Sequence, residues 1–307
     1  MNRTAPLITL LGVSLGALTL TGCGAGGPTA AGLASPPSSA PGLPTPQMPS
    51  TWSPAPATTA GAPAPATAPA ASDSPAPASP TGKPLAGRTI VLDPGHNPGN
   101  VAHTTEINRQ VDIGNGRKEC DTTGTATDAG YTEADYSLDV SHRIRDLLKA
   151  LGATVLLTQD GDHPWGPCIT DRAAFGNAAH ADAAISVHGD GGPASGSGFH
   201  VIMPAKVVAG KADTTAITAP SHRLGLLVRD SFHTVTGEPY ADYIGDQGLD
   251  TRDDLGGLNL SGIPKVFIEC GNMRNAGDAQ RMTDPQWRQR AAQGIADAFT
   301  AFLTTTG

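Results

Sequence analysis

Short apolar runs alternate with amphipathic runs along the chain from about residue 85 onward. The apolar runs have the length and character of buried strands. They predict strands at residues 89–92, 154–158, 183–188, 199–203 and 265–269. Because helical patterns lie between these strands, the alternation favours an α/β sheet with helices on both faces.

The amphipathic runs predict the helices. The first follows Thr132, an N-cap residue type with Asp135 three residues later, and it ends at Gly152. An apolar stripe runs along this helix at Leu138, Ile144, Leu147, Leu148 and Leu151. Further helices are expected at residues 170–179, 221–236 and 285–303.

Residues 1–23 have the pattern of a secretory signal. Arg3 gives a positive start, and residues 6–20 are mostly apolar but too few to span a membrane as a helix. The sequence LTGC at residues 20–23 resembles the lipobox of bacterial lipoproteins, in which cleavage precedes an acylated cysteine. We therefore expect a lipid on Cys23 that anchors the chain to the outer face of the cytoplasmic membrane. The alternative is an ordinary signal peptide with a chance cysteine.

Residues 24–84 have the composition of a linker. More than half of the 27 prolines lie there, among alanine, serine, threonine and glycine, and the only charged residues are Asp73 and Lys83. Such a segment cannot bury enough apolar surface to offset its ordering entropy. We expect it to be disordered and extended, either as a spacer that holds the folded part away from a membrane or as a passive tail.

Residues 85–307 are enough for one domain with a sizeable core. The formal net charge is -8 and there is no dense run of lysine or arginine, which argues against nucleic acid as a partner. A second apolar segment of membrane length is absent from the sequence, so membrane contact is expected only through the lipid anchor. No apolar surface stripe stands out, and we expect a monomer.

The polar segment 104–130 has no clear periodicity, which in a compact domain is typical of a functional or mobile loop. We expect a hairpin or flap there, with Cys120 pinning it at one point. Cys168 lies in another polar loop, and Cys270 ends an apolar run. Three cysteines allow three pairings in an exported protein. Because Cys120–Cys168 is the pairing that joins two loops, we expect this disulfide and a buried free thiol at Cys270.

Four ionisable side chains lie at the ends of predicted elements. His96 follows the first strand in DPGHN, His188 and Glu269 end two other strands, and Glu133 begins a helix. In open α/β sheets, sites form beyond the carboxyl ends of the strands. Two imidazoles and a carboxylate suit catalytic zinc, which takes three protein ligands and a water whose pKa falls toward ~7. We therefore expect Zn²⁺ on His96, Glu133 and His188, with Glu269 as the general base and acid.

Each of these residues also has an ordinary structural explanation. A histidine at a strand end is more often structural than a ligand, Glu133 could be a charge favoured by a helix N-terminus, and Glu269 could pair with an arginine. The candidate ligands are far apart in the sequence and match no short zinc motif such as HExxH. Among the other histidines, His200 at the start of a strand is the candidate for a substrate contact.

The order of the motifs favours the zinc hypothesis. DPGHN, GYTEAD, DRAAFGNAAHADAAISVHGDGG, DLGGLN and KVFIECGNMRN occur in this order within residues 88–304. This order resembles the zinc-dependent N-acetylmuramoyl-L-alanine amidases of the amidase-3 family, and most closely their single-domain actinobacterial members. The resemblance implies a three-layer α/β domain with a mixed, mostly parallel sheet flanked by helices. It also implies that His96, Glu133 and His188 are zinc ligands and that Glu269 is the catalytic glutamate.

The resemblance further implies a reaction, which is cleavage of the amide between N-acetylmuramic acid and the L-alanine of the stem peptide. Peptidoglycan or muropeptides are then the expected partners. Residues 255–260 and 190–192 are expected to line the groove, and Arg172 and Asn177 to support the strand that carries His188. Two alternatives remain, a zinc peptidase that cuts within the stem peptide and a non-catalytic wall-binding lipoprotein.

Overall fold

The computed structural model describes residues 82–305. The expected signal peptide (1–23) with Cys23, and all of the expected linker (24–84) except its last three residues, lie outside the described residues. Within residues 82–305, no helix combines the length and the apolar character that a membrane span requires.

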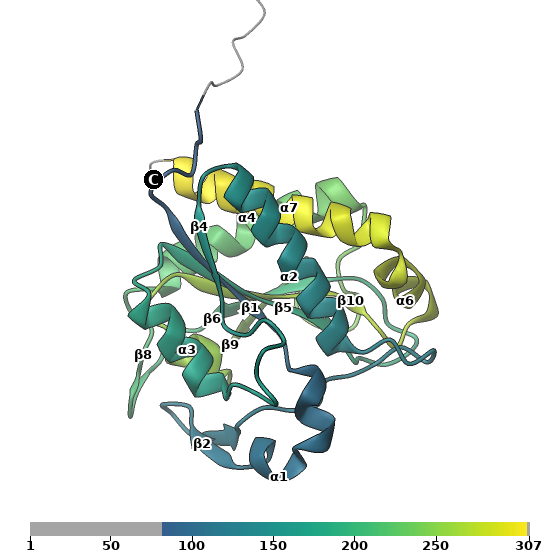
Figure 1. Ribbon diagram of the computed structural model, residues 1–307, viewed down its shortest axis with the longest axis horizontal. Helices are drawn as coiled ribbons and strands as arrows, with labels where there is room; N and C mark the ends of the chain where they lie inside the picture. Colours follow the sequence, from purple (N-terminus) through teal and green to yellow (C-terminus); the bar gives the residue numbers. More distant parts are fainter. Residues whose placement is uncertain (1–81, 306–307) are drawn as a thin grey trace, which may run out of the picture. The chain divides into compact units, whose positions relative to one another are not determined.

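A six-stranded sheet forms the centre of the described region (Figure 1). The strand order is β4-β1-β5-β10-β6-β9. The bounds are β4 (Thr154–Leu157), β1 (Thr89–Pro94), β5 (Ala183–Asp190), β10 (Lys265–Asn272), β6 (His200–Pro204) and β9 (Leu249–Arg252). β6 runs antiparallel to β10, and the other neighbouring pairs are parallel. The expected mixed, mostly parallel sheet is confirmed.

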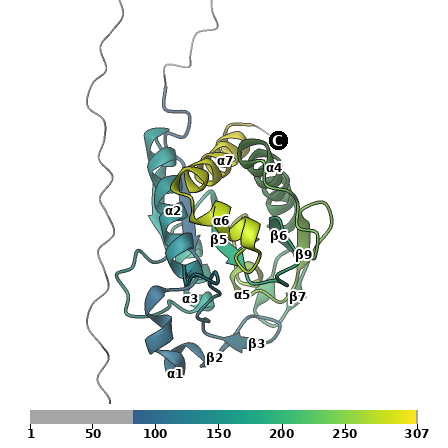
Figure 2. The same ribbon diagram turned by 90° about the vertical axis from the view of Figure 1, so that its right-hand side faces the viewer.

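Helices cover both faces of this sheet (Figures 1 and 2). On one face α2 (Glu133–Ala150) and α4 (Thr218–Thr236) pack against the strands, and α7 (Pro285–Thr304) packs against both of these helices. On the other face lie α3 (Ile169–Ala178) and the short α5 (Gly256–Asn259). The three-layer α/β prediction is therefore confirmed, and each predicted helix is present.

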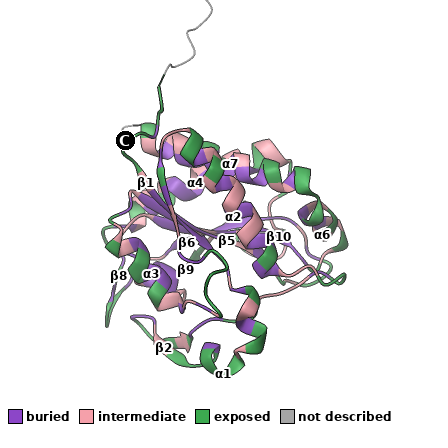
Figure 3. Ribbon diagram, in the orientation of Figure 1, coloured by how far each residue is buried: buried purple, intermediate pink, exposed green. Residues whose placement is uncertain are grey.

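The main core lies between the sheet and the α2, α4 and α7 helices, where the strands are buried (Figure 3). Phe232 sits at its centre, with its ring centroid 4.6 Å from that of Phe199 and 6.0 Å from that of Trp287. Fully buried aromatic side chains contribute strongly, because truncating one costs about 3–5 kcal/mol. This core fixes the central strands, whose carboxyl ends carry the residues described below.

Several short elements lie outside the predicted set. Besides β9 and α5, they are η1 (Pro98–Ala102), α1 (Thr104–Ile107), β2 (Gln110–Asp112), β3 (Arg117–Glu119), β7 (Val208–Ala209), β8 (Ala212–Asp213) and α6 (Ala276–Thr283). β2 and β3 form a hairpin within the polar segment 104–130, as that segment's composition led us to expect. An ion pair of 2.7 Å between Lys118 Nζ and Asp254 Oδ2 connects this hairpin to the segment that follows β9.

The ends of the α2 helix are fixed by local sequence, and its N-terminal end positions the candidate residue Glu133. Thr132 caps the helix, because its side-chain oxygen accepts a hydrogen bond from Asp135 N at 3.1 Å. Gly152 follows the last turn with a φ of 98°, a left-handed conformation that favours glycine. The cap fixes the first helical residue, Glu133, with its side chain directed away from solvent.

Candidate metal centre

The three central strands end at the candidate site. β1, β5 and β10 are neighbours, and their register pairs His188 with Glu269. His96 lies just beyond β1, with a left-handed φ of 58°. Gly95 precedes it, and a Cβ atom there would lie 2.4 Å from the His188 ring. Only glycine at this position lets the turn after β1 bring His96 close to His188.

His96, Glu133 and His188 converge. One possible ligand atom from each lies within 4.8 Å of the others. His96 Nε2 is 3.2 Å and His188 Nδ1 is 2.8 Å from Glu133 Oε1. The two imidazole rings are 5.0 Å apart and nearly perpendicular, at 89°. Two imidazole nitrogens and a carboxylate oxygen in this arrangement can hold one divalent cation, and the donor types suit zinc.

Electrostatics at this cluster favour a positive charge. Burial raises the pKa of Glu133, but His96 and His188 outweigh it and hold that pKa well below its usual range. Burial lowers the pKa of His96, but the Glu133 carboxylate and Asp121 outweigh it and raise that pKa to about 10. The buried carboxylate therefore needs a cation beside it, either a proton on an imidazole or a metal ion. The residues present fit a metal on this ground as well as by donor type.

Glu269 lines the same cavity as these three residues. Its side chain is half-buried, and its Oε2 atom is buried with no hydrogen-bond partner among the described residues. Burial raises the pKa of Glu269, and the carboxylates of Glu133 and Asp190 raise it further. A carboxyl group with a raised pKa beside a candidate metal site is suited to accept and donate a proton.

Two cavities that share part of their lining open at the site. The first, of about 280 Å³, has apolar walls from Ile169, Leu255 and Phe267. The second, of about 340 Å³, carries Asp190 and Arg252 as well as Glu269. His96 and His188 line both cavities. Leu255 and Phe267 also line both cavities, and residues within the expected groove segments 255–260 and 190–192 contribute to the lining, so the candidate site lies in a groove.

Asp93 lies in a buried cluster of charges next to the site, with 3% of its surface exposed. Its carboxylate accepts hydrogen bonds from Lys265 Nζ (2.9 Å), Arg172 Nη1 (3.0 Å), Thr158 Oγ1 (2.6 Å) and Ser186 Oγ (2.5 Å). Burial raises the pKa of Asp93, but Lys265 and Arg172 outweigh it and hold that pKa well below its usual range. This cluster ties β1, β5, β10 and α3 together directly behind His96.

The structure corrects the roles expected for two residues of α3. Arg172 donates hydrogen bonds to the main-chain oxygens of Pro94 and His96, so it supports the end of β1. Asn177 donates to the main-chain oxygen of Leu260, so it supports the loop before β10. Neither side chain hydrogen-bonds to β5 among the described residues, so the expected direct support of that strand is wrong, and Arg172 reaches β5 only through Asp93 and Ser186.

His200 also differs from its expected role. It is 1% exposed and pairs with Glu269 across β6 and β10, so it offers no surface to a substrate. Its Nδ1 atom has no hydrogen-bond partner among residues 82–305. His200 therefore packs behind Glu269, where burial lowers the pKa of its imidazole.

The structure contains a disulfide between Cys120 and Cys168, and Cys270 is a buried free cysteine. The disulfide places Asp121 next to His96, with 3.1 Å between Asp121 Oδ1 and His96 Nδ1. Asp121 was not among the predicted site residues, because it lies in a segment without periodicity. The one sequence signal that points to it is the neighbouring cysteine.

Comparison with known proteins identifies the family. The chain matches the family described as N-acetylmuramoyl-L-alanine amidase over residues 90–301. The chain belongs to this amidase family. It is 40% identical over 240 residues to the N-acetylmuramoyl-L-alanine amidase Rv3717 of Mycobacterium tuberculosis, which covers 78% of this chain and 95% of that relative.

Two crystal structures of N-acetylmuramyl-L-alanine amidases resemble the amidase closely. Ami1 from Mycobacterium smegmatis has a TM-score of 0.67 and 40% identity, and the match covers 72% of this chain and 99% of that one. The apo form of Ami1 from Mycobacterium abscessus has a TM-score of 0.66 and 43% identity, covering 71% and 100%. The match spans nearly the whole of both crystallised chains.

Substitution of Asp93 by asparagine tests the charge cluster of the amidase. Asp93→Asn leaves two buried cations, Lys265 and Arg172, without their shared carboxylate. We expect the free energy of unfolding at pH 7 to fall by about 3–5 kcal/mol, measured by urea denaturation. The matched control is Asp182→Asn, which changes a partly exposed pair with Arg88 at the other end of β1 and should cost about 1 kcal/mol or less.

The free energy of unfolding of Asp93→Asn should also depend on pH differently from that of the wild type. The folded pKa of Asp93 lies below its unfolded value of about 3.9, so its ionised form stabilises the fold above that value. This stabilisation is lost as the pH falls. The free energy of unfolding of the wild type should therefore decrease from about pH 5 to pH 2 more steeply than that of Asp93→Asn. Parallel curves for the two proteins would contradict the assignment.

Proposed function

We propose that this amidase cuts the amide between N-acetylmuramic acid and the L-alanine of the stem peptide with a zinc ion held by His96, Glu133 and His188. Glu269 is the proposed proton carrier. The observation that carries this proposal is that one cavity is lined by all four side chains. The family description and the names of the mycobacterial relatives support the same reaction.

The donor set accounts for the choice of metal. Imidazole and carboxylate ligands suit zinc, and three protein ligands leave a coordination position for water or substrate, as in other catalytic zinc sites. A zinc ion held there would polarise the scissile carbonyl and lower the pKa of a bound water. Main-chain groups restrain Glu133 as a ligand, because its Oε2 atom accepts a hydrogen bond from Thr125 N at 2.9 Å.

Glu269 has the environment that a proton carrier needs. Its carboxyl group takes the proton of the attacking water and delivers it to the amine nitrogen of L-alanine as the C–N bond breaks. Its buried Oε2 atom has no partner within the described part of the chain that would compete for that proton. Each turnover returns the carboxyl group to its starting state, so one residue serves both as base and as acid.

The position of Glu269 also sets the direction of the substrate. Glu269 lines the second cavity and not the first cavity. The group that receives the proton is the amine of the stem peptide, so the peptide occupies the second cavity beside Asp190 and Arg252. The N-acetylmuramic acid side then lies in the first cavity, beside Ile169 and Lys118.

Glu269→Gln removes the proton carrier and keeps the size of the side chain. We expect kcat on purified muropeptides to fall by about 10²–10⁴-fold, while the zinc content measured by mass spectrometry is unchanged. Glu106→Gln, which alters an exposed glutamate of α1, is the matched control and should keep wild-type turnover. Turnover of Glu269→Gln at the wild-type rate would remove this residue from the mechanism.

The products and a chelator separate the proposal from its alternatives. Mass spectrometry of digested muropeptides should show a free L-alanine amine, whereas a peptidase would leave cuts within the stem peptide. Chelation should abolish hydrolysis and added Zn²⁺ should restore it. A chain that only binds the cell wall would give no product under either condition, and unchanged hydrolysis in metal-free protein would contradict the role of zinc.

We also infer that the amidase is an exported, monomeric lipoprotein that works in the cell wall. Its proposed substrate lies outside the cytoplasmic membrane, and LTGC at residues 20–23 supplies a signal for export and acylation. A lipid on Cys23 would tether the chain to the outer face of that membrane, and the Pro-rich residues 24–84 would give it reach.

Cys23→Ala tests the anchor. We expect wild-type full-length protein, produced in a bacterium that processes lipoproteins, to sediment with the membrane fraction and the variant to lose this association, because no acyl chain can be attached. Quantitative immunoblotting of the fractions measures the shift. Thr29→Ala, just beyond the expected cleavage site, is the control and should sediment like the wild type. Wild-type protein in the soluble fraction would contradict the proposal.

A further inference from the structure

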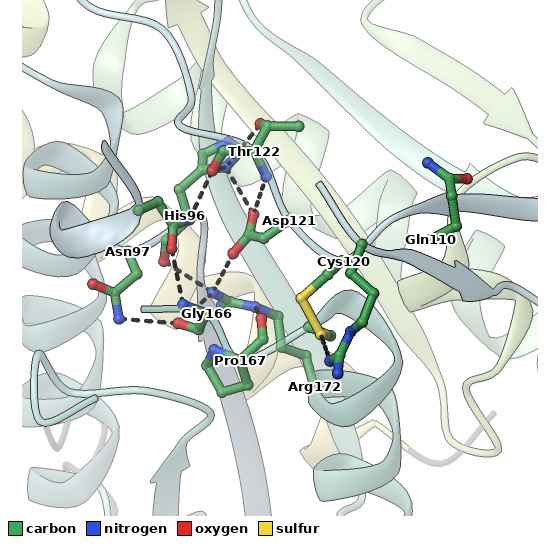
Figure 4. Close-up of a disulfide and its surroundings, with 12 residues drawn as sticks. His96, Asn97, Gln110, Cys120, Asp121, Thr122, Gly166, Pro167 and Arg172 are labelled. Carbon is green, nitrogen blue, oxygen red and sulfur yellow. Dashed lines mark hydrogen bonds and ion pairs between the residues drawn. A yellow bond between two sulfur atoms is a disulfide. The ribbon is translucent and has the colours of Figure 1, made fainter. Parts of the chain in front are cut away.

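Both nitrogen atoms of the His96 imidazole ring have polar neighbours. His96 Nε2 faces Glu133, while Nδ1 lies 3.1 Å from Asp121 Oδ1 and 3.1 Å from the main-chain oxygen of Thr122 (Figure 4). A carboxylate and a carbonyl group can only accept hydrogen bonds. Nδ1 must therefore carry a hydrogen, which leaves the Nε2 lone pair as the one available to a metal.

Asp121 is itself fixed in place. It is 5% exposed, and its Oδ2 atom accepts a hydrogen bond of 3.1 Å from Arg172 Nη2. Its Oδ1 atom, the one that faces His96, also accepts a hydrogen bond of 2.8 Å from Thr122 N. The same Arg172 nitrogen donates to the main-chain oxygen of His96 at 2.9 Å. One guanidinium group thus sets the Asp121 carboxylate and the His96 backbone relative to each other.

The disulfide brings this pair together. Cys120 directly precedes Asp121, and its partner Cys168 is the N-cap residue of α3, which carries Arg172. The main chain adds a hydrogen bond of 2.7 Å from Ile169 N to the oxygen of Cys120. Figure 4 shows the disulfide beside Asp121 and Arg172. The loop that carries Asp121 is therefore fastened to the helix that carries Arg172 by a covalent and a hydrogen bond.

We propose that Asp121 is a positioning residue of the metal centre, which holds the His96 ring with its Nε2 atom toward the metal. This inference rests on the proposed function, because it concerns the orientation of a proposed zinc ligand. Metal-bound histidines commonly donate their second nitrogen to a carboxylate or carbonyl group, and loss of that partner costs about 10–100-fold in metal affinity or activity. Within the described part of the chain the Asp121 side chain hydrogen-bonds to His96, Thr122 N and Arg172 and not to Glu269 or Glu133, so its effect passes through His96.

Zinc affinity is the direct test. The dissociation constant of the full chain for Zn²⁺ at pH 7 is measured by competition with a chromophoric chelator, for the wild type, Asp121→Asn and Asp121→Ala. We expect Asp121→Ala to bind zinc about 10–100-fold more weakly than the wild type. Asp121→Asn should bind with an intermediate affinity, because its amide oxygen can still accept a hydrogen bond from Nδ1. In protein loaded with Co²⁺, the visible absorption bands should shift in the variants, because the His96 ring is no longer held at one angle.

A matched control separates positioning from a general loss of stability. Asp182→Asn makes the same change in another Asp–Arg pair, at the far end of β1. Its zinc affinity and its Co²⁺ spectrum should equal those of the wild type. Zinc affinities of both Asp121 variants equal to that of the wild type would overturn the inference.

A measurement on the wild type decides the question even where the variants fail to fold. In zinc-loaded protein labelled with ¹⁵N, long-range ¹H–¹⁵N spectra identify which nitrogen of each histidine carries a hydrogen. We expect His96 to carry its hydrogen on Nδ1 and to bind zinc through Nε2. Binding through Nδ1 would overturn the inference, because Asp121 would then occupy the wrong side of the ring.

Failure of the inference differs from failure of the proposed function. A Glu133→Gln variant that binds zinc as tightly as the wild type, or a wild type that binds no zinc, would overturn the proposed metal centre and the inference with it. Weakened binding in Glu133→Gln together with wild-type binding in both Asp121 variants would overturn the inference alone.

Discussion

The buried carboxylate of Glu133 is the constraint on which the rest of the site depends. It is 5% exposed and lies between the imidazoles of His96 and His188. Burial opposes ionisation, so the carboxylate stays charged only if the surroundings supply positive charge or hydrogen-bond donors. The Thr125 amide and the N-terminus of α2 supply part of this, and the two imidazoles face it from the other side. The fold thereby creates a position for a cation.

A chain of buried ions of alternating sign leads from the sheet to His96. Lys265, Asp93, Arg172 and Asp121 follow one another at distances of 2.9, 3.0 and 3.1 Å, and Asp121 lies 3.1 Å from the His96 ring. Because each of these groups is buried, removing any one leaves a neighbour without its counter-charge. The position of His96 is thus set jointly by β10, β1, α3 and the disulfide-bonded loop, which are far apart in the sequence.

The sequence revealed the parts of this arrangement that follow a pattern. His188 and Glu269 end apolar runs, and neighbouring parallel strands bring such ends to one edge of the sheet, so their meeting could be predicted. Asp121 and Lys265 could not be placed, because a charged residue in a loop or at the start of a strand shows no periodicity. The β9 strand, Leu249–Arg252, was missed for a similar reason, since its alternating sequence LDTR has no apolar run. Partners across the fold decide these positions, and those partners are visible only once the chain is folded.

The chain of buried ions contributes more to the positioning of His96 than to the stability of the fold. Buried ion pairs are often no more stabilising than apolar side chains of similar size, because desolvation offsets their attraction. A planar guanidinium, however, fixes direction as well as distance. Arg172 donates to the main-chain oxygen of His96, and Gln159 donates to the same oxygen at 3.1 Å. These bonds hold His96 in a left-handed conformation that costs about 1–3 kcal/mol for a residue other than glycine. Apolar side chains could not hold the His96 backbone in this conformation, because they offer no hydrogen-bond donors to its main-chain oxygen. The buried polar groups do so, and they thereby place the His96 imidazole at the proposed metal site.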